Sequence, residues 1–487
     1  MEQRISRMTD ILWKDDGING ALDYAGQISW IMFLKFLNDY ELSKYNASLL
    51  TGEEYDYILA QEYRWDVWAC PKKDDGKLDT VNALGGADLM EFVNDKLFMY
   101  LKKFRELHID NAKSVQYKIG EIFGELHNRV ANGNTLREVL DIMDSIHFDN
   151  SSEMYQLSLA YESILKNMAS GGSNSGEFYT PRALVKTIVD VVNPQVGEKV
   201  YDPACGTAGF LVEANEHMRQ GNLSTDDLQK LKTDTFNGIE KTSLSFAMGI
   251  MNMILHGVDA PNIFKTNTLT KELSAIEEKD RFEVILANPP FGGQEREQIQ
   301  NNFPIKSKAT ELLFLQHMMK SVKIGGRVGL VIPEGVLFQT NNAFKDVKKM
   351  LLEDYKLHTI LSLPAGIFLP YSNVKTNVIF FDRSGGTTDI WYYEMNLAKK
   401  LTKNKPIRYE QFAEFLELQK TRALSDNSWI VKKEDIKEYD ISAKNPTSAE
   451  VIEHKKPVEI IEIIENNTKE ILDLVSEIKK IVPSFTS

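Results

Sequence analysis

A short segment of the sequence combines residue types that suit chemistry on a planar amine. Asn288, Pro289, Pro290 and Phe291 follow the apolar run FEVILA. Proline has no backbone N–H and cannot continue a strand's hydrogen bonds, so the segment must leave the sheet as a loop. The Asn288 side-chain oxygen and the Pro289 carbonyl can accept the two hydrogens of an exocyclic amine. Two such acceptors favour a tetrahedral nitrogen as charge develops during reaction.

The same loop carries an aromatic ring and two stiff residues. The face of Phe291 offers a surface on which a base swung out of a duplex can stack, which is worth about 1–3 kcal/mol. The two prolines hold the acceptors in place before reaction. A turn that merely ends a strand is the alternative. The three matched residue types at the end of one strand favour chemistry over that alternative.

A glycine-rich turn in VYDPACGTAGF follows another apolar strand. Asp202 ends the strand, and Gly206 and Gly209 allow a tight turn before a helix, as doubly wound folds do around a nucleoside. The glycine spacing differs from the dinucleotide fingerprint. A carboxylate at the strand tip would repel a pyrophosphate and attract a cation, so an amino-acid ammonium group fits better.

A second carboxylate, Glu240 in NGIEK, ends the next strand. In such folds an acid at this position commonly accepts two ribose hydroxyls, whereas an isolated one is more often a surface helix cap. Asp202 and Glu240 together describe a nucleoside with a cationic amino-acid tail. That description fits S-adenosylmethionine and makes the Asn288 loop a candidate for methyl transfer.

The elements around these residues alternate between strands and helices. This alternation predicts an α/β fold with a Rossmann-like, mostly parallel sheet covered by helices on both faces. The last two strands have too short a connection for a helical crossover, so they are expected to form an antiparallel hairpin closing one edge. The expected strands are KVYDPA, TFNGIE, NIFKTNTL, FEVILAN, RVGLVIP, HTILSLP and NVKTNVIFFDR, and two of the expected helices are LSFAMGIMNMILHG and AFKDVKKMLLEDY.

The chain outside this region is expected to be helical. Apolar residues recur at three- and four-residue intervals before about residue 168, and ASGGSNSGEFYTPR then marks a boundary. We therefore predict a helical domain over 1–168, the sheet domain over 169–448 and a helical tail over 449–487. The tail has one apolar stripe, which can pack on its own domain or on another chain. The stripe consists of Ile464, Ile471, Val475, Ile478 and Val482.

Composition limits the class of protein. The chain has 487 residues, a formal net charge of −13 and only Cys70 and Cys205, which support neither a disulfide framework nor a zinc site. No apolar run reaches the ~18 residues that a membrane helix needs, so a cytoplasmic protein is expected. An acidic chain needs a local basic groove or a partner to hold nucleic acid.

Three motifs together resemble a known family. DPACGTAGF followed by NPPF, with GEFYTPR upstream of both, resembles the amino-group DNA methyltransferases in their gamma motif order, which act on adenine N6. With the helical N-terminal region and the C-terminal helix, the chain is similar to the modification (M) subunit of type I restriction–modification systems. The resemblance implies methyl transfer from S-adenosylmethionine to the N6 amine of a flipped adenine in double-stranded DNA.

The resemblance also implies roles for individual residues. Asn288 to Phe291 would hold the adenine, and Glu240 would hold the ribose of the cofactor. Where family members often carry an acid after the third strand, this chain has Asn267, which we take as a further cofactor contact. The residues implied at the methionine end of the cofactor are Tyr179, Thr180, Pro181, Asp202, Gly206 and Gly209.

Partners follow from the resemblance and from what the sequence lacks. The resemblance implies a specificity (S) subunit, a second modification subunit and a restriction and translocase (R) subunit. The chain has no G-x-x-x-x-G-K-[ST] segment, so ATP-driven translocation must lie on another chain. It also has no evident basic and aromatic domain for groove reading, so a separate subunit would choose the DNA sequence.

Two other functions remain open on the sequence alone. An NPPF-type loop also suits enzymes that methylate glutamine side chains in proteins, because a carboxamide presents a similar planar NH2 group. The long helical N-terminal region disfavours that function. The chain could also be a nonenzymatic assembly subunit, although intact Asp202, Asn288 and Phe291 count against it.

Overall fold

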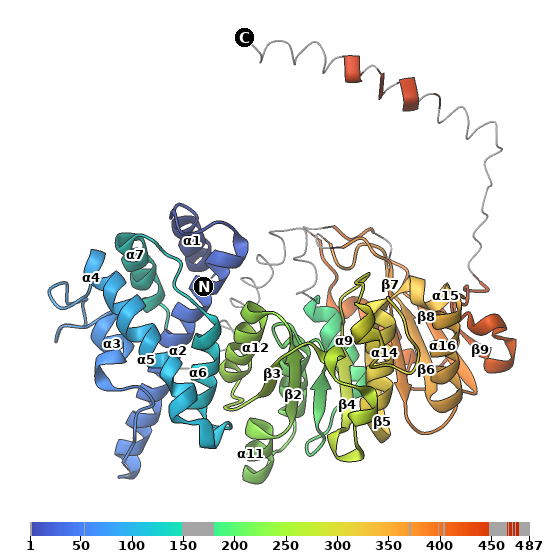
Figure 1. Ribbon diagram of the computed structural model, residues 1–487, viewed down its shortest axis with the longest axis horizontal. Coiled ribbons are helices and arrows are strands. Elements are labelled where there is room, and N and C mark those ends of the chain that lie inside the picture. Colours follow the sequence, from blue (N-terminus) through green and yellow to red (C-terminus); the bar gives the residue numbers. More distant parts are fainter. Residues whose placement is uncertain are drawn as a thin grey trace. The chain divides into compact units, whose positions relative to one another are not determined.

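A computed structural model gives the fold (Figure 1). It describes residues 2–52, 54–148, 180–369, 372–397, 399–402, 405–447, 465, 467–469, 471–472 and 474–476. The chain divides into two compact units, Met1–Ala443 and Lys444–Ser487. Among the described residues, no helix is long and apolar enough to cross a bilayer.

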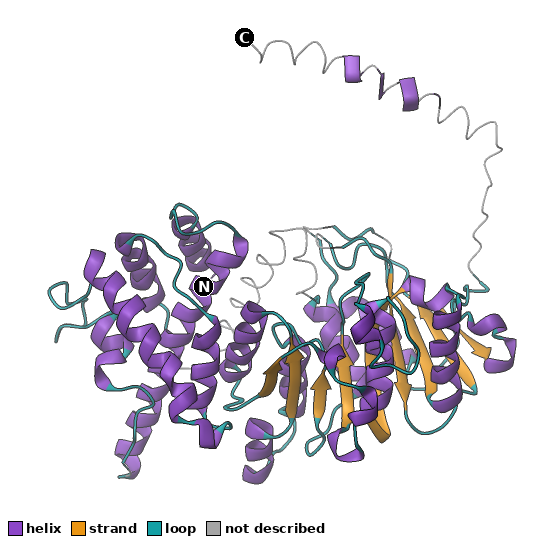
Figure 2. Cartoon of the chain, viewed as in Figure 1, coloured by secondary structure: helices purple, strands orange, loops and turns teal. Residues whose placement is uncertain are grey.

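The N-terminal part of the first unit is helical, as predicted (Figure 2). The long helix α2 buries every residue from Tyr24 to Leu37, so it forms the centre of this part. A π-helical stretch, Phe92–Leu97, joins α4 to α5. The helices are α1 (Glu2–Leu12), α2 (Ala21–Thr51), α3 (Trp65–Trp68), α4 (Gly86–Glu91), α5 (Phe98–Leu107), α6 (Val115–Glu125) and α7 (Gly133–Asp144).

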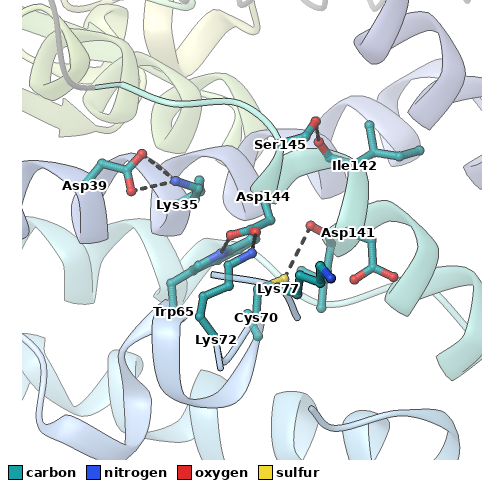
Figure 3. A network of polar contacts seen from close by, with 12 residues as sticks. Lys35, Asp39, Trp65, Cys70, Lys72, Lys77, Asp141, Ile142, Asp144 and Ser145 are labelled. Atoms are coloured by element: carbon teal, nitrogen blue, oxygen red, sulfur yellow. Dashed lines mark hydrogen bonds and ion pairs between the residues drawn. The ribbon is translucent and has the colours of Figure 1, made fainter. Parts of the chain in front are cut away.

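Polar contacts partner the charges of these helices, both within one helix and between helices (Figure 3). The Lys35 ammonium on α2 lies 2.6 Å from the Asp39 carboxylate, one turn later. Asp144 at the end of α7 accepts from the Trp65 indole N–H at 2.9 Å and pairs with Lys72. The buried or half-buried charges of Lys35, Asp39 and Asp144 are thus partnered, as charges taken out of water must be, whereas Lys72 is exposed.

The sheet lies in the rest of the first unit. Within the described residues its strand order is β3-β2-β1-β4-β5-β7-β6-β8-β9. Only β7 and β9 run against the other strands. The strands are β1 (Val200–Asp202), β2 (Phe236–Glu240), β3 (Asn262–Lys265), β4 (Phe282–Ala287), β5 (Val322–Pro333), β6 (Lys356–Ser362), β7 (Thr376–Asp382), β8 (Asp389–Glu394) and β9 (Ser428–Lys432).

Helices cover both faces of the sheet. Along β4, Val284 and Leu286 join the apolar core shared with the N-terminal helices, whereas Ile285 and Ala287 join a second core with α14 and α16. This alternation shows that both faces are packed, which explains why the last four residues of the strand, Val284 to Ala287, are all apolar. The helices are α9 (Arg182–Val192), α10 (Gly209–Met218), α11 (Thr225–Thr233), α12 (Ser243–Leu255), α13 (Glu297–Gln300), α14 (Thr310–Ser321), α15 (Glu334–Phe338), α16 (Asn342–Asp354) and α17 (Ala413–Leu418).

The predicted Rossmann-like architecture is confirmed, with one difference in the hairpin. β6 and β7 pair antiparallel as expected, but β7 lies between β5 and β6, and β8 and β9 extend the sheet beyond them. The pair therefore does not close the edge, because β6 pairs with β8 on its other side and β9 is the outermost strand. The strands DIWYYE and SWIVK were not anticipated from the sequence.

The predicted domain boundaries and most of the tail lie outside the described residues. Residues 168 and 448 belong to the parts that the structure does not describe, so the three predicted domains stay predictions. Of the apolar stripe, Ile471 and Val475 are described and are 59% and 41% exposed. Ile464, Ile478 and Val482 are outside the described residues.

Replacing Gly120 by alanine should destabilise the chain. Helix α6 packs so closely on α5 that a Cβ at Gly120 would lie 2.1 Å from the Arg105 backbone nitrogen. Because overpacking costs about 1–3 kcal/mol, the free energy of unfolding should fall by that amount, as measured from the urea midpoint. Gly124 on the same helix faces open space, so Gly124→Ala should be neutral or stabilising by up to about 1 kcal/mol. Equal effects of the two substitutions would contradict this account.

Candidate active site

The predicted site residues gather at one edge of the sheet. Asp202, Glu240 and Asn288 stand at the carboxyl ends of β1, β2 and β4, which are adjacent and parallel. Neighbouring strands lie about 4.8 Å apart, so these three positions span roughly 10 Å. Asp202 and Asn288, which are 86 residues apart in the sequence (288 − 202), thus lie in one site.

Asp202 is a buried carboxyl group, with 2% of its surface exposed. Burial is the main cause that raises its pKa to about 8, and the nearby Glu240 carboxylate raises it further. The Ala204 backbone N–H donates to Asp202 Oδ1 at 3.0 Å, and this hydrogen bond lowers the pKa of Asp202. A cation placed beside this carboxyl group would favour its ionised form.

Glu240 fastens the glycine-rich turn to the next strand. One of its oxygens accepts from the Gly206 N–H at 3.0 Å, and the other accepts from the Thr242 N–H at 2.7 Å and the Thr242 hydroxyl at 2.8 Å. A carboxylate has about four lone-pair sites, so these bonds leave about one free. Glu240 would have to release a Thr242 bond to accept two ribose hydroxyls.

The turn between β1 and α10 has an unusual backbone. Gly206 has φ +53°, and Ala208, directly before α10, has φ +64°, a value that alanine rarely adopts. Gly249 on α12 lets the turn come close, since a Cβ there would lie 3.0 Å from the Gly206 carbonyl oxygen. Gly209, the first residue of α10, is exposed, and a Cβ there would meet nothing within 4 Å. A ligand can therefore approach this helix start.

Asn267 serves a local structural purpose. Its side-chain oxygen accepts from the Leu269 N–H at 3.0 Å and caps the short 3₁₀ helix Thr268–Thr270. One lone pair of that oxygen and the side-chain NH2 group remain available. A cofactor contact by Asn267 stays a prediction.

The nitrogen and the oxygen of the Asn288 side-chain amide differ in their hydrogen bonding. The nitrogen donates to the Thr180 hydroxyl at 2.9 Å. The oxygen is buried and has no hydrogen-bond partner among the described residues. Because a buried acceptor without a donor costs about 1–3 kcal/mol, this oxygen is suited to a donor from outside the chain. Pro181, the residue after Thr180, is the N-cap of α9. Tyr179 lies outside the described residues.

Phe291 and the residues around it include two features that sequence reasoning missed. The half-buried Phe291 ring meets the buried Phe368 ring edge to face, with centroids 5.8 Å apart. Phe368 belongs to the connection between β6 and β7, which the sequence marked only as a hairpin link. Glu311 at the start of α14 has a buried oxygen without a partner among the described residues, and burial raises its pKa. An acidic residue in the first turn of a helix rich in apolar residues was its only sequence signal.

Substituting Glu240 with glutamine should loosen the turn. An amide nitrogen would replace one acceptor, so at least one of the N–H groups of Gly206 and Thr242 would lose its bond. The expected loss of unfolding free energy is about 1–3 kcal/mol, measured by urea denaturation. The exposed Glu272 offers a matched control, and Glu272→Gln should change stability by less than about 0.5 kcal/mol. Similar losses for both variants would show that Glu240 does not hold the turn.

Comparisons with known proteins identify the family to which the chain belongs. The model of the N-6 DNA methylase family matches residues 153–456, and the HsdM N-terminal domain model matches residues 1–143. The type I restriction enzyme EcoEI methylase subunit of Escherichia coli is 34% identical over 493 residues, covering 98% of this chain and 96% of the relative.

Solved structures give the same result. A modification subunit of a putative type I restriction enzyme from Vibrio vulnificus YJ016 has a TM-score of 0.83 and 37% identity, covering 93% of this chain and 99% of that chain. A chain from a study of complex assembly in a type I restriction–modification system has a TM-score of 0.77 and 38% identity, covering 100% of this chain and 98% of its own. The chain therefore belongs to the N-6 DNA methylase family, as a modification subunit of a type I restriction–modification system.

Proposed function

We propose that this chain transfers a methyl group from S-adenosylmethionine to the N6 amine of an adenine flipped out of double-stranded DNA. A separate specificity subunit would choose the sequence. The observation that carries the proposal is the Asn288 side chain, whose nitrogen is anchored by Thr180 and whose buried oxygen accepts from no residue that the structure describes.

The Asn288 geometry matches an adenine amine. The Thr180 bond holds the amide nitrogen, so the oxygen cannot exchange places with it without losing that bond. An N6 amine brings two N–H donors, one for Asn288 and one for the Pro289 carbonyl. Accepting both hydrogens draws the nitrogen lone pair out of the ring, so the nitrogen could bond to the methyl carbon while the bond from that carbon to the cofactor's sulfur breaks. The thioether S-adenosylhomocysteine would be the leaving group, and the nitrogen would then lose one proton to water.

Phe291 would bind the ring of the same adenine. Its own ring is held from the side by Phe368, so its orientation is fixed before a base arrives. A flipped base loses its stacking in the duplex, and stacking on Phe291 offsets part of that loss. The position of Phe291, three residues after Asn288, lets one loop bind both the face and the edge of the base.

The residues at β1 and β2 fit S-adenosylmethionine. This cofactor supplies an activated methyl group when it is bound. The buried Asp202 carboxyl group would take its ammonium group, and Glu240 would take the ribose after releasing Thr242. The open approach at Gly209 leaves room beside the backbone. Thr180 and Pro181, which lie beside Asn288 through the Thr180 contact, would border the methionine end.

The proposed partners follow from charge and from relatives. A net charge of −13 argues against a duplex held by this chain alone, because duplex binding depends on neutralising phosphates. The structural relative cited for complex assembly belongs to a type I restriction–modification system. We propose that this chain likewise assembles with a specificity subunit, a second modification subunit and a restriction subunit. The exposed Ile471 and Val475 of the tail offer an apolar contact for the specificity subunit.

Removing the Asn288 side chain should separate catalysis from cofactor binding. In the complex with the specificity subunit, Asn288→Ala should lower kcat for DNA methylation by about 10²–10³, because an acceptor used in the transition state is lost. Its Kd for S-adenosylmethionine, measured by calorimetry, should stay within about threefold of wild type. Asp202→Asn should weaken cofactor binding by about 10–100-fold, the worth of a hydrogen bond to a charged group. Equal loss of cofactor affinity in both variants would contradict the assigned roles.

Cofactor affinity should depend on pH through Asp202. With a pKa of about 8, Asp202 is mostly protonated below neutral pH, whereas an ammonium partner requires the ionised form. The association constant should therefore rise by up to about tenfold per pH unit between about pH 5.5 and 7.5, with proton release on binding. Calorimetry in buffers of different ionisation enthalpy measures both effects. Asp202→Asn should abolish them, and an unchanged pH dependence in that variant would exclude Asp202 as the titrating group.

A further inference from the structure

A basic segment follows β8 in this acidic chain. Residues 396–408 read NLAKKLTKNKPIR, with five lysines or arginines and no acidic residue, whereas the whole chain has a net charge of −13. The segment is built into the fold, because Leu401 and Ile407 are only 8% and 5% exposed. Thr402 and Lys405 exchange backbone hydrogen bonds of 3.2 and 3.0 Å. Lys399 and Lys400 therefore stand next to residues that the fold holds in place.

A groove of about 460 Å³ lies between this basic segment and the connection from β6 to β7. Lys399 and Lys400 line it and are exposed, and neither forms an ion pair with any residue that the structure describes. Lys375 also lines the groove, but it pairs with Glu334 at 2.8 Å. The other lining residues include Leu363, Leu369 and Leu401, and no described lining residue is aromatic. The groove thus offers free ammonium groups rather than a stacking surface.

The groove lies at the same edge of the sheet as the candidate active site. β4, β6 and β8 run in one direction, so Asn288, Ser362 and Glu394 all stand at carboxyl ends. The two sites share a connection: Phe368 contacts Phe291, and Leu369, the next residue, lines the groove.

The separation suits a duplex that passes over both sites. From β4 to β8 there are four strand steps, which at about 4.8 Å each give roughly 19 Å. Phosphates on one DNA strand repeat about every 3.4 Å along the helix axis, so this distance corresponds to roughly five or six nucleotides.

We infer that Lys399 and Lys400 bind the phosphate backbone of the DNA, to one side of the flipped adenine. This inference rests on the proposed function. Unpaired lysines act as point charges that suit phosphate oxygens, and the described lining residues provide no aromatic ring on which a base could stack. The groove would supply part of the phosphate-binding positive charge that the net acidic chain otherwise lacks.

The test measures the salt dependence of duplex binding by the full-length chain in complex with its specificity subunit. Each phosphate contact contributes about 0.9 to the slope of log affinity against log salt, so Lys399→Gln/Lys400→Gln should lower that slope by about 1.8. Between about 50 and 200 mM salt, wild-type affinity should then fall about tenfold more than that of the variant. Lys399→Arg/Lys400→Arg should keep the wild-type slope.

The matched control removes two charges at the other end of the strands, where β8 begins. Lys432 lies opposite Asp389, the first residue of β8, in the ladder between β8 and β9, and its ammonium group pairs with Glu434 at 3.5 Å. Lys432→Gln/Lys433→Gln should therefore leave the slope unchanged. An unchanged slope in the Lys399/Lys400 glutamine variant, or an equal change in the control, would overturn the inference. A wild-type complex that binds duplex with the expected slope but transfers no methyl group would refute the proposed function and leave the groove standing.

Discussion

Parallel pairing of β1, β2 and β4 forces all three strands to end at the same edge of the sheet. Both faces of this sheet are covered, so the buried stretches of the strands are largely apolar, and the polar side chains of the candidate site stand where the strands end. Asp202, Glu240 and Asn288 occupy those ends. The site therefore follows from strand direction, and the helices serve to make the strands rigid.

Burial gives this edge its chemical character. A carboxyl group that is 2% exposed and an amide oxygen without a donor among the described residues both destabilise the chain by amounts on the order of 1–3 kcal/mol each. The two apolar cores on either side of the sheet offset that cost. The glycine-rich turn needs further support, which Glu240 provides from β2 and which Asn252 on α12 provides by donating to the Thr207 carbonyl at 2.8 Å.

Sequence patterns were sufficient where the signal was local. The apolar runs ending in Asp202, Glu240 and Asn288 predicted strands, and the structure places all three ends together. Phe368 could not be predicted as a neighbour of Phe291, because 77 residues separate them (368 − 291) and their contact depends on how β7 inserts between β5 and β6. For the same reason the predicted position of the β6–β7 hairpin at the edge of the sheet was wrong, because β8 and β9 extend the sheet beyond it. The bonds that occupy Glu240 were also invisible, since they arise from the backbone of the folded turn.

The most direct test of the account is the chemical identity of the methylated product. The chain, its specificity subunit and duplex DNA would be incubated with S-adenosylmethionine carrying a deuterated methyl group, and the DNA nucleosides and the proteins would be analysed by mass spectrometry. The account predicts the label on the N6 nitrogen of deoxyadenosine, with unlabelled protein. Label on a cytosine or on a glutamine side chain would contradict it.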